Sequence, residues 1–190
     1  MLLLQLRLRF AGPAMDWQVD LNHTEVTFEV RHLFTPVTGK FDTFEVDLTF
    51  DPAAPEAAHV SAVIQVASVD TNNDRRNEHL RTPDFFDAES FPTITFESAS
   101  VRQVGENEYV ASGDLKIRDV TRRVDLPITL LGVADIPQEM QGMLGSEQIA
   151  SFQAELTIDR RDFGVGTGSW AETAIVGSEV KIKLLLEAGR

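Results

Sequence analysis

The feature that most constrains this sequence is a strict alternation of apolar and polar side chains, which recurs in separate segments along the chain. In the first segment, Val26, Phe28 and Val30 fall on one face of an extended backbone and polar residues fall on the other. The alternating segments are 25–32, 44–50, 60–66, 94–104, 109–117, 124–130, 152–158 and 180–186. A period of two is typical of strands with one buried face, so we predict about eight strands.

Only one stretch, residues 68–96, contains a convincing helix. Polar side chains at 72–74 can accept hydrogen bonds from the free N–H groups of a first helical turn. Pro83 ends the helix, because the residue before a proline is pushed out of the helical region. A helix this short and polar cannot cover a sheet, and we expect it to lie as a flap across one end of the molecule.

The strands must therefore bury their apolar faces against one another, because no other element is large enough to cover them. Short connections favour antiparallel neighbours, and long strands in up-and-down order favour a closed barrel over a sandwich, since closure removes the sheet edges. The predicted fold is all-β, an extended antiparallel barrel of about eight strands with a short helix capping one end. Such a barrel is either filled by its own side chains or holds one small ligand.

Several positions predict interruptions of this pattern. Pro36 and Gly39 are expected to end the first strand, and Pro127 to cause a bulge or an unpaired edge in the sixth. Residues 134–147 are expected to form a loop or a loose helix. The glycine-rich segment 164–168 is expected to be a flexible connector, because it lacks the lysine and the following helix of a phosphate-binding loop.

The length of 190 residues indicates one domain with enough chain for a core. We assign residues 15–190 to the barrel domain and residues 1–14 to an N-terminal extension that is either disordered or the product of an alternative start. Gln5, Arg7 and Arg9 interrupt the leucines of this extension, which makes it a poor match to a signal peptide. We therefore expect a cytoplasmic protein, with a periplasmic or secreted location as the alternative.

The charge and composition of the chain exclude several classes of protein. A net charge of −13 argues against nucleic-acid binding, which needs a basic face, and against broad adsorption to anionic membranes. No apolar run approaches the roughly 20 residues of a transmembrane helix. The absence of cysteine excludes disulfides and thiolate catalysis. We expect no nucleic-acid partner and no transmembrane segment, while a transient membrane contact and a homodimer stay open.

Basic residues are expected to gather at one rim of the barrel, because up-and-down order brings the ends of alternate strands together. This set is Arg31, His32, Arg75, Arg76, His79, Arg81, Arg118, Arg122, Arg123, Arg160 and Arg161. It holds nine of the chain's thirteen arginines, although the protein is strongly acidic. One interpretation is a site for an anionic or polar head group, which guanidinium groups suit. The other is a ring of surface ion pairs, each of which contributes little.

The chain carries no clear catalytic motif. There is no Gly-x-Ser-x-Gly elbow and no cysteine nucleophile. The four histidines lack the spacing of metal sites. If the rim brings His32 and His79 together, Glu78 would make a third metal ligand, but hydrogen bonding is the simpler role for these histidines. We therefore predict no catalytic residue, no metal and no cofactor.

Many spaced motifs between Asp16 and Ala188 match one known family. They are Asp16-Trp17 with His23, Phe28 and His32; Gly39-x-Phe41; Ser68-Val69-x-Thr71; Arg76-x-x-His79-Leu80; Phe85-Phe86-Asp87; Phe91-Pro92-x-Ile94-x-Phe96; Gly113-x-Leu115-x-Ile117; and Arg160-x-Asp162-Phe163-Gly164. With these motifs the sequence resembles the YceI-like family, also described as polyisoprenoid-binding. Asn77 departs from the pattern, because the family usually has aspartate after the arginine, and this change removes a charge near the rim.

The resemblance implies an extended lipocalin-like antiparallel β-barrel that binds a long amphiphile in an apolar tunnel. The expected ligand is a polyisoprenoid, an isoprenoid quinone or a fatty-acid derivative, held for transport or storage. The expected tunnel residues are Phe28, Val30, Phe44, Val46, Phe50, Val66, Phe85, Phe86, Phe96, Leu115, Ile117, Ile128, Phe152 and Leu156. The expected head-group residues at the rim are His32, Arg76, His79 and Arg160.

Three hypotheses for the function follow. The first is a non-catalytic lipid carrier. The second is a lipid-modifying enzyme in which His32 or His79 acts as general base. The third is a barrel filled by its own side chains that serves as an interaction module, because the fold alone does not determine function.

Overall fold

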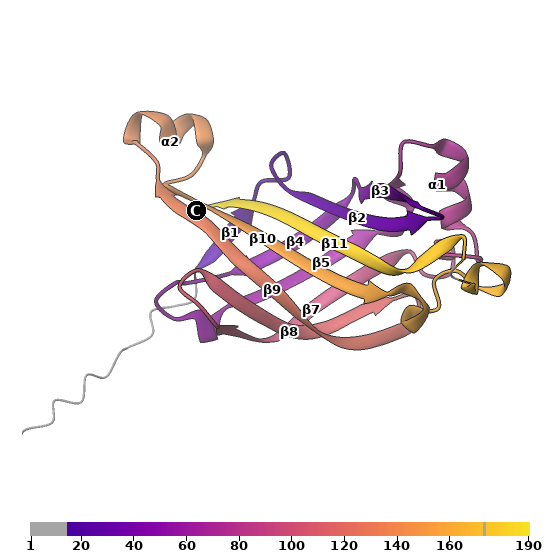
Figure 1. The fold of residues 1–190 in the computed structure, drawn as a ribbon. Coiled ribbons are helices and arrows are strands. Elements are labelled where there is room, and N and C mark those ends of the chain that lie inside the picture. Colours follow the sequence, from indigo (N-terminus) through magenta and orange to yellow (C-terminus); the bar gives the residue numbers. More distant parts are fainter. Residues whose placement is uncertain (1–14, 173) are drawn as a thin grey trace, which may run out of the picture.

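The computed structural model describes residues 15–172 and 174–190, which form one closed antiparallel β-barrel with a helix at each end (Figure 1). The N-terminal extension that we expected at 1–14 lies outside the described residues. The strands are β1 (Asp16–Val19), β2 (Glu25–His32), β3 (Thr35–Phe41), β4 (Phe44–Thr49), β5 (His59–Gln65), β6 (Val69–Asp70), β7 (Thr93–Gln103), β8 (Glu108–Ile117), β9 (Val120–Asp135), β10 (Gln148–Asp159) and β11 (Val176–Gly189). The helices are α1 (Asp74–Arg81), α2 (Gln138–Leu144) and the 3₁₀ turns η1 (Pro55–Ala57), η2 (Val66–Ser68), η3 (Arg160–Phe163) and η4 (Gly168–Ala171).

These segments make an eight-stranded barrel, because three of the long strands are each interrupted once. β2 pairs with β3 while β1 pairs with β4, so β1 and β2 are halves of one strand, and β3 and β4 are halves of the next. β4 pairs with β5 and β3 with β6, which makes β5 and β6 the third. β11 closes the barrel, because one of its edges pairs with β10 and the other with both β1 and β2. The predicted eight-stranded antiparallel barrel is therefore confirmed.

The prediction that Pro36 and Gly39 end the first strand was wrong, because both residues lie inside β3. β3 pairs with β2 along its whole length but with β6 only at Lys40 and Phe41. At Pro36 it is therefore an edge strand, and an edge strand tolerates a residue without an N–H donor. A Cβ added at Gly39 would lie 2.4 Å from Cζ of Phe28, so the glycine makes room for that ring.

Pro127 marks an unpaired edge, as predicted. The ladder between β9 and β10 ends at the pair Ile128 and Ala154, and Pro127, the neighbour of Ile128, has no partner in β10. Residues 120–127 of β9 continue their pairing with β8. The two strands therefore separate toward the end of the barrel where α1 lies, and the apolar side chains of Val124 and Leu156 pack in the same core there.

Residues next to each helix explain where α1 begins and ends and where α2 ends. The Asn73 side chain caps α1 by accepting from the Arg76 N–H at 3.0 Å, and α1 ends at Thr82, before the proline. The segment predicted as a loop or loose helix forms α2, which ends where Gly145 adopts a left-handed φ of 70°. Among the described residues no helix has both the length and the apolar character needed to cross a bilayer.

The interior of the barrel holds two apolar clusters along its axis. The cluster near α2 contains Trp17, whose Nε1 donates to the Phe50 carbonyl at 2.9 Å, and Phe50 stands edge-on to Tyr109 and Phe152. The cluster near α1 is built around Phe41, Phe85 and Phe163 and other buried side chains. Three partly buried residues pack against both clusters, namely Phe96, Leu156 and Leu184.

Gly113 lies where the wall of the barrel packs tightly against Phe96, at the boundary between the two apolar clusters. An added Cβ at Gly113 would lie 2.4 Å from the Glu97 carbonyl oxygen and 2.7 Å from Cζ of Phe96. Because backbone cannot move aside cheaply, we expect Gly113→Ala to lower the free energy of unfolding by about 1–3 kcal/mol in urea titrations. Gly132→Ala is the control, because nothing lies within 4 Å of its added Cβ, and it should leave stability nearly unchanged. Equal effects of the two variants would contradict this account.

The junction between β1 and β2 predicts a pH effect. His23 Nδ1 lies 2.8 Å from Asp20 Oδ2 and 3.6 Å from Glu187 Oε1. The hydrogen bond with Asp20, helped by the charges of both carboxylates, raises the pKa of His23 above its usual value. The contribution of the charged His23 to the free energy of unfolding is therefore fully present below the pKa that His23 has in the unfolded chain. It is lost as the pH rises through the raised pKa of His23 in the folded protein. An NMR titration should show His23 titrating above an unfolded-state histidine, and Asp20→Asn should lower the pKa of His23. No change in that variant would refute the pairing.

Candidate functional site

The candidate site begins with an open cavity of about 490 Å³ at the end of the barrel where α1 lies. Most polar side chains of its wall come from α1 and the segment before it, and most apolar ones come from β2, β3, the start of β11 and the loops at Phe85 and Trp170. We call this cavity the mouth, and its lining residues are Phe28, Val30, His32, Val37, Thr71, Asn73, Arg75, Arg76, His79, Leu80, Phe85, Trp170 and Val176.

Two smaller apolar cavities lie deeper in the barrel. The upper chamber, of about 110 Å³, shares Phe28, Val30 and Phe85 with the mouth and is lined further by residues such as Ile117 and Ile158. The lower chamber, of about 80 Å³, is lined by the cluster near α2, including Phe50 and Phe152. The mouth, the upper chamber and the lower chamber therefore follow one another along the barrel.

Phe96, Leu156 and Leu184 form the partition between the two chambers, because each packs against both apolar clusters. An apolar cavity of about 150 Å³ admits a molecule of the size of benzene. Each chamber is smaller than that. In the structure described, the side chains thus almost fill the barrel, and a long apolar chain can enter only if side chains of the partition change their rotamers.

An aromatic cluster roofs the mouth. The His79 ring stands edge-on to Phe85 and Trp170, with centroids 5.1 and 5.0 Å away, and Phe85 and Trp170 are 5.6 Å apart. His79 Nε2 lies 3.1 Å from Asp84 Oδ2, which orients the imidazole. Trp170 was not among the predicted site residues, although a tryptophan next to a glycine-rich connector is a signal that could have identified it. With Trp170 packed on the roof, that connector is tied to the site.

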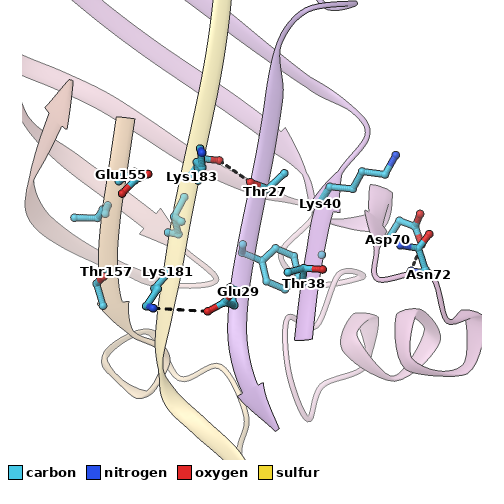
Figure 2. Close-up of a pocket in the computed structure, with 14 residues that line it drawn as sticks. Thr27, Glu29, Thr38, Lys40, Asp70, Asn72, Glu155, Thr157, Lys181 and Lys183 are labelled. Carbon is cyan, nitrogen blue, oxygen red and sulfur yellow. Dashed lines mark hydrogen bonds and ion pairs between the residues drawn. The ribbon is translucent and has the colours of Figure 1, made fainter. Parts of the chain in front are cut away.

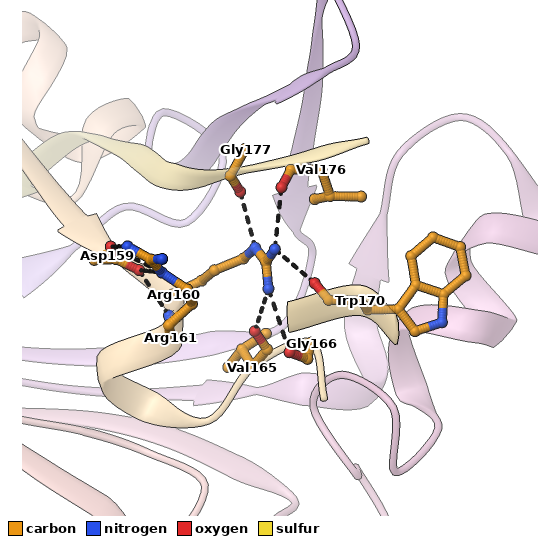
Figure 3. Close-up of polar contacts among 8 residues, drawn as sticks. All are labelled: Asp159, Arg160, Arg161, Val165, Gly166, Trp170, Val176 and Gly177. Carbon is orange, nitrogen blue, oxygen red and sulfur yellow. Dashed lines mark hydrogen bonds and ion pairs between the residues drawn. The ribbon is translucent and has the colours of Figure 1, made fainter. Parts of the chain in front are cut away.

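Arg160 is placed differently from the other predicted head-group residues, because it lines the upper chamber and not the mouth. It is buried, with 4% of its surface exposed, and its guanidinium lies among main-chain carbonyls of η4 and of the segments before and after it (Figure 3). It donates to five main-chain carbonyls, those of Val165, Gly166, Trp170, Val176 and Gly177. Burial lowers the pKa of Arg160, and the carbonyl dipoles take the place of a carboxylate partner. Arg160 is therefore a staple that holds the segment from η3 to the start of β11.

Arg118 acts in a similar way on the other side of the roof. Its Nη1 donates to the carbonyls of Phe85 at 2.8 Å and Gly164 at 2.6 Å, and its guanidinium lies over the Phe91 ring. Arg81 donates to the carbonyls of Ala67 and Val69. Neither interpretation of the arginine ring was complete, because these side chains bind main-chain oxygens rather than carboxylates. They fix the loops around the mouth.

Two arginines of α1 line the mouth. Arg76 donates through Nε and Nη2 to the hydroxyl and carbonyl oxygens of Thr71, both at 2.7 Å. Arg75 is exposed and has no hydrogen-bond or ion-pair partner among the residues 15–172 and 174–190. Arg75 is therefore the cation of the mouth that is most available to a head group.

Asn77 is buried below α1 and does not face the mouth. Its carbonyl oxygen accepts from the Thr71 N–H at 2.8 Å and hydroxyl at 2.7 Å, and its amide donates to Asp70 Oδ1 at 2.9 Å. An amide can accept from one neighbour and donate to an aspartate, whereas a carboxylate at this position would repel Asp70. The departure from the family motif is thus explained by local hydrogen bonding, and it leaves the charge of the mouth unchanged.

The fourteen predicted tunnel residues all lie in the two apolar clusters or line the chambers. Whether they contact a ligand stays a prediction. Of the predicted head-group residues, His32, Arg76 and His79 line the mouth and Arg160 does not. His32, His79 and Glu78 do not form a group of potential metal ligands in the described part of the chain, where Asp20, His23 and Glu187 make the one such group.

A separate groove of about 720 Å³ lies on the outer face of β10, β11, β2 and β3 (Figure 2). It contains three of the chain's four lysines, Lys40, Lys181 and Lys183. Lys181 Nζ lies 3.7 Å from Glu29 Oε1, and Lys40 Nζ lies 2.7 Å from Asp42 Oδ1. Because its charges are mixed and partly paired, this groove differs in chemistry from the apolar interior.

Comparisons with known proteins agree with this architecture. The model of the YceI-like domain family matches residues 17–188. Protein YceI of Escherichia coli is 36% identical over 157 residues, which cover 81% of this chain and 78% of that protein. The crystal structure of Burkholderia cenocepacia BcnA superposes with a TM-score of 0.80 at 32% identity and covers 90% of this chain and 99% of that one. A polyisoprenoid binding domain from Saccharophagus degradans has a TM-score of 0.66 at 14% identity, with 91% and 97% covered, and shares the fold.

Arg160 and Arg161 form a matched pair for testing the staple. We expect Arg160→Leu to lower the free energy of unfolding by about 3 kcal/mol or more, because several buried carbonyls lose their donor. Arg161 is exposed, bonds to Asp159 and holds the pKa of that carboxyl at about 2. Arg161→Leu should therefore cost less than about 1 kcal/mol. Urea titrations followed by tryptophan fluorescence measure both variants. Similar losses of stability in the two variants would show that the bonds of Arg160 to the main-chain carbonyls do not stabilise the protein more than an exposed ion pair does.

Proposed function

The chain belongs to the YceI-like domain family, and on that premise we propose that it is a non-catalytic protein that binds the apolar chain of a long lipid inside its barrel. The observation that carries the proposal is the sequence of mouth, upper chamber and lower chamber along one axis. Both chambers have almost wholly apolar walls, while the mouth carries cations. This order suits a molecule with a long apolar tail and a small polar or anionic head.

The ligand class follows from the two ends of the site. Burial of tail carbons contributes about 25 cal/mol per Å² of apolar surface before the costs of association. Arg75 and Arg76 offer donors to a phosphate, carboxylate or quinone oxygen, and His32 and His79 lie beside them. A polyisoprenoid, an isoprenoid quinone and a fatty-acid derivative all meet these requirements. The printed description of the Saccharophagus degradans domain as polyisoprenoid binding supports the first of these.

A lipid-modifying enzyme is the second candidate, and one observation favours it. His79 Nε2 is 3.1 Å from Asp84 Oδ2, and a histidine oriented by a carboxylate can act as a general base. The hydroxyl of Thr71, which lines the mouth, is already bonded to Asn77 and Arg76 rather than to His79. We therefore place binding first. Chemical change of a bound lipid that is lost in His79→Ala, with lipid binding retained, would reverse this order.

Native mass spectrometry of the freshly purified protein, followed by organic extraction, tests the proposal. We expect a stoichiometric adduct that extraction identifies as an isoprenoid or a fatty acyl compound. If the protein is free of lipid, a polyprenyl phosphate, a quinone and a fatty acid are added in turn. Failure of all three to bind would favour the third hypothesis, a barrel filled by its own side chains.

The partition between the chambers predicts the preferred tail length. Phe96→Ala removes the largest side chain of the partition, so we expect the extracted or exchanged lipids to shift toward longer chains. Phe152→Trp adds bulk beside the lower chamber and should shift them toward shorter chains. Phe91→Ala is the control, because Phe91 lies under Arg118 and lines neither chamber. Mass spectrometry of the bound lipids measures the shift, and identical lipid profiles in all three variants would count against a continuous tunnel.

A further inference from the structure

The hairpin between β2 and β3 ends in an exposed apolar tip. Its two turn residues are Leu33, with 45% of its surface exposed, and Phe34, with 96% exposed. Ile175, with 49% exposed, lies beside them, since the Leu33 N–H donates to the Ile175 carbonyl at 2.7 Å. We call these three residues the apolar tip. Exposure of a phenyl ring to this extent favours aggregation and needs a physical reason.

The backbone conformation of the tip also disfavours large apolar residues. Leu33 adopts a left-handed φ of 52°. Two-residue hairpin turns with a positive φ are normally built from asparagine, aspartate or glycine, and a larger side chain there is strained. The chain thus places two large apolar residues where both solubility and turn geometry favour small polar ones. Such a conflict with local preferences is typical of functional positions.

The apolar tip adjoins the mouth. His32 and Val37 flank the turn on β2 and β3, Val176 follows Ile175, and all three line the mouth. The end of β2, where the turn begins, lies at the same end of the barrel as α1 (Figure 1). A surface that covers the apolar tip would therefore lie next to the opening of the barrel.

The charge around the apolar tip suggests what covers it. Residues 31–39 contain Arg31 and no carboxylate, in a chain whose net charge is −13, and Arg31 Nη1 donates to the Leu33 carbonyl of the tip. A second exposed apolar group, at Met140 and Met143 of α2, has the opposite surroundings, because residues 135–147 contain three carboxylates and no lysine or arginine. Aromatic side chains insert at the interface of a bilayer, and basic residues near them are attracted to anionic lipids.

We propose that the apolar tip inserts into the interface of a phospholipid bilayer and sets the mouth against the membrane surface. Lipid then passes between bilayer and barrel without crossing water. The contact is transient, because only three apolar side chains enter the interface and the rest of the chain is acidic. This inference rests on the proposed function and assigns its partner, the membrane that donates or accepts the lipid.

Vesicles of three parts phosphatidylcholine to one part phosphatidylglycerol provide the test. We expect the wild-type protein to sediment with them in low salt, and Phe34→Asp to reduce its partition coefficient about tenfold or more, the factor that burial of one phenyl side chain supplies. Phe34→Trp should keep the binding, and its fluorescence should be quenched by brominated lipids. Met143→Asp is the matched control at the opposite end, because Met143 is 73% exposed, and it should bind as the wild type does.

Each outcome separates this inference from the proposed function. Lipid uptake from detergent micelles should be equal in Phe34→Asp and wild type, while uptake from vesicles should slow in the variant alone. If the wild type takes up lipid but neither sediments with vesicles nor shows quenching in Phe34→Trp, membrane insertion is overturned and lipid binding stands. If it binds vesicles through Phe34 but never takes up lipid, the proposed function fails instead. A dimer that Phe34→Asp dissociates, without vesicle binding, would assign the apolar tip to a second copy of the chain and overturn the inference.

Discussion

The pairing of β11 with both halves of the first strand is the constraint on which the rest of this structure depends. Each long strand has one apolar face, and in the described part of the chain no helix is large enough to cover it, so the faces are buried only if the sheet closes on itself. Closure directs these faces to a common axis and creates the space for the two chambers. It also leaves the polar faces outside, where lysines and carboxylates line a groove of mixed charge (Figure 2).

The second organising interaction is the bonding of one buried and one half-buried arginine, Arg160 and Arg118, to main-chain carbonyls. Loops at the end of a barrel leave carbonyl groups without partners, and a guanidinium can satisfy several of them at once. Arg160 binds five carbonyls and Arg118 binds others from two loops. The roof of the mouth is therefore held in place by arginines that, from the sequence alone, would be expected to bind a ligand. The cations left for a head group are few, and Arg75 is the one with the least internal bonding.

The interior of the barrel is apolar and is nearly filled by its own side chains, which limits the space for a ligand. The partition of Phe96, Leu156 and Leu184 separates chambers that are each too small for a long chain. Empty apolar space destabilises a protein, and the side chains of the partition keep that space small. On the outside of the barrel, the exposed apolar tip adjoins the mouth, and the two form one surface.

The sequence alone was enough to predict the closed barrel and a short helix with its cap at one of residues 72–74. The predicted tunnel residues lie in the apolar clusters or line a chamber, and their contact with a ligand stays a prediction. The barrel and the helix depend on local rules, namely the period of two, capping and the effect of proline, that act over a few residues. Tertiary structure decided what depends on distant partners. Pro36 lies inside a strand because β3 has a free edge there, Arg160 is buried because five carbonyls converge on it, and Trp170 reaches the roof by packing on His79. Which side chains are free to meet a ligand could be known only after closure, because closure determines which donors are already used within the chain.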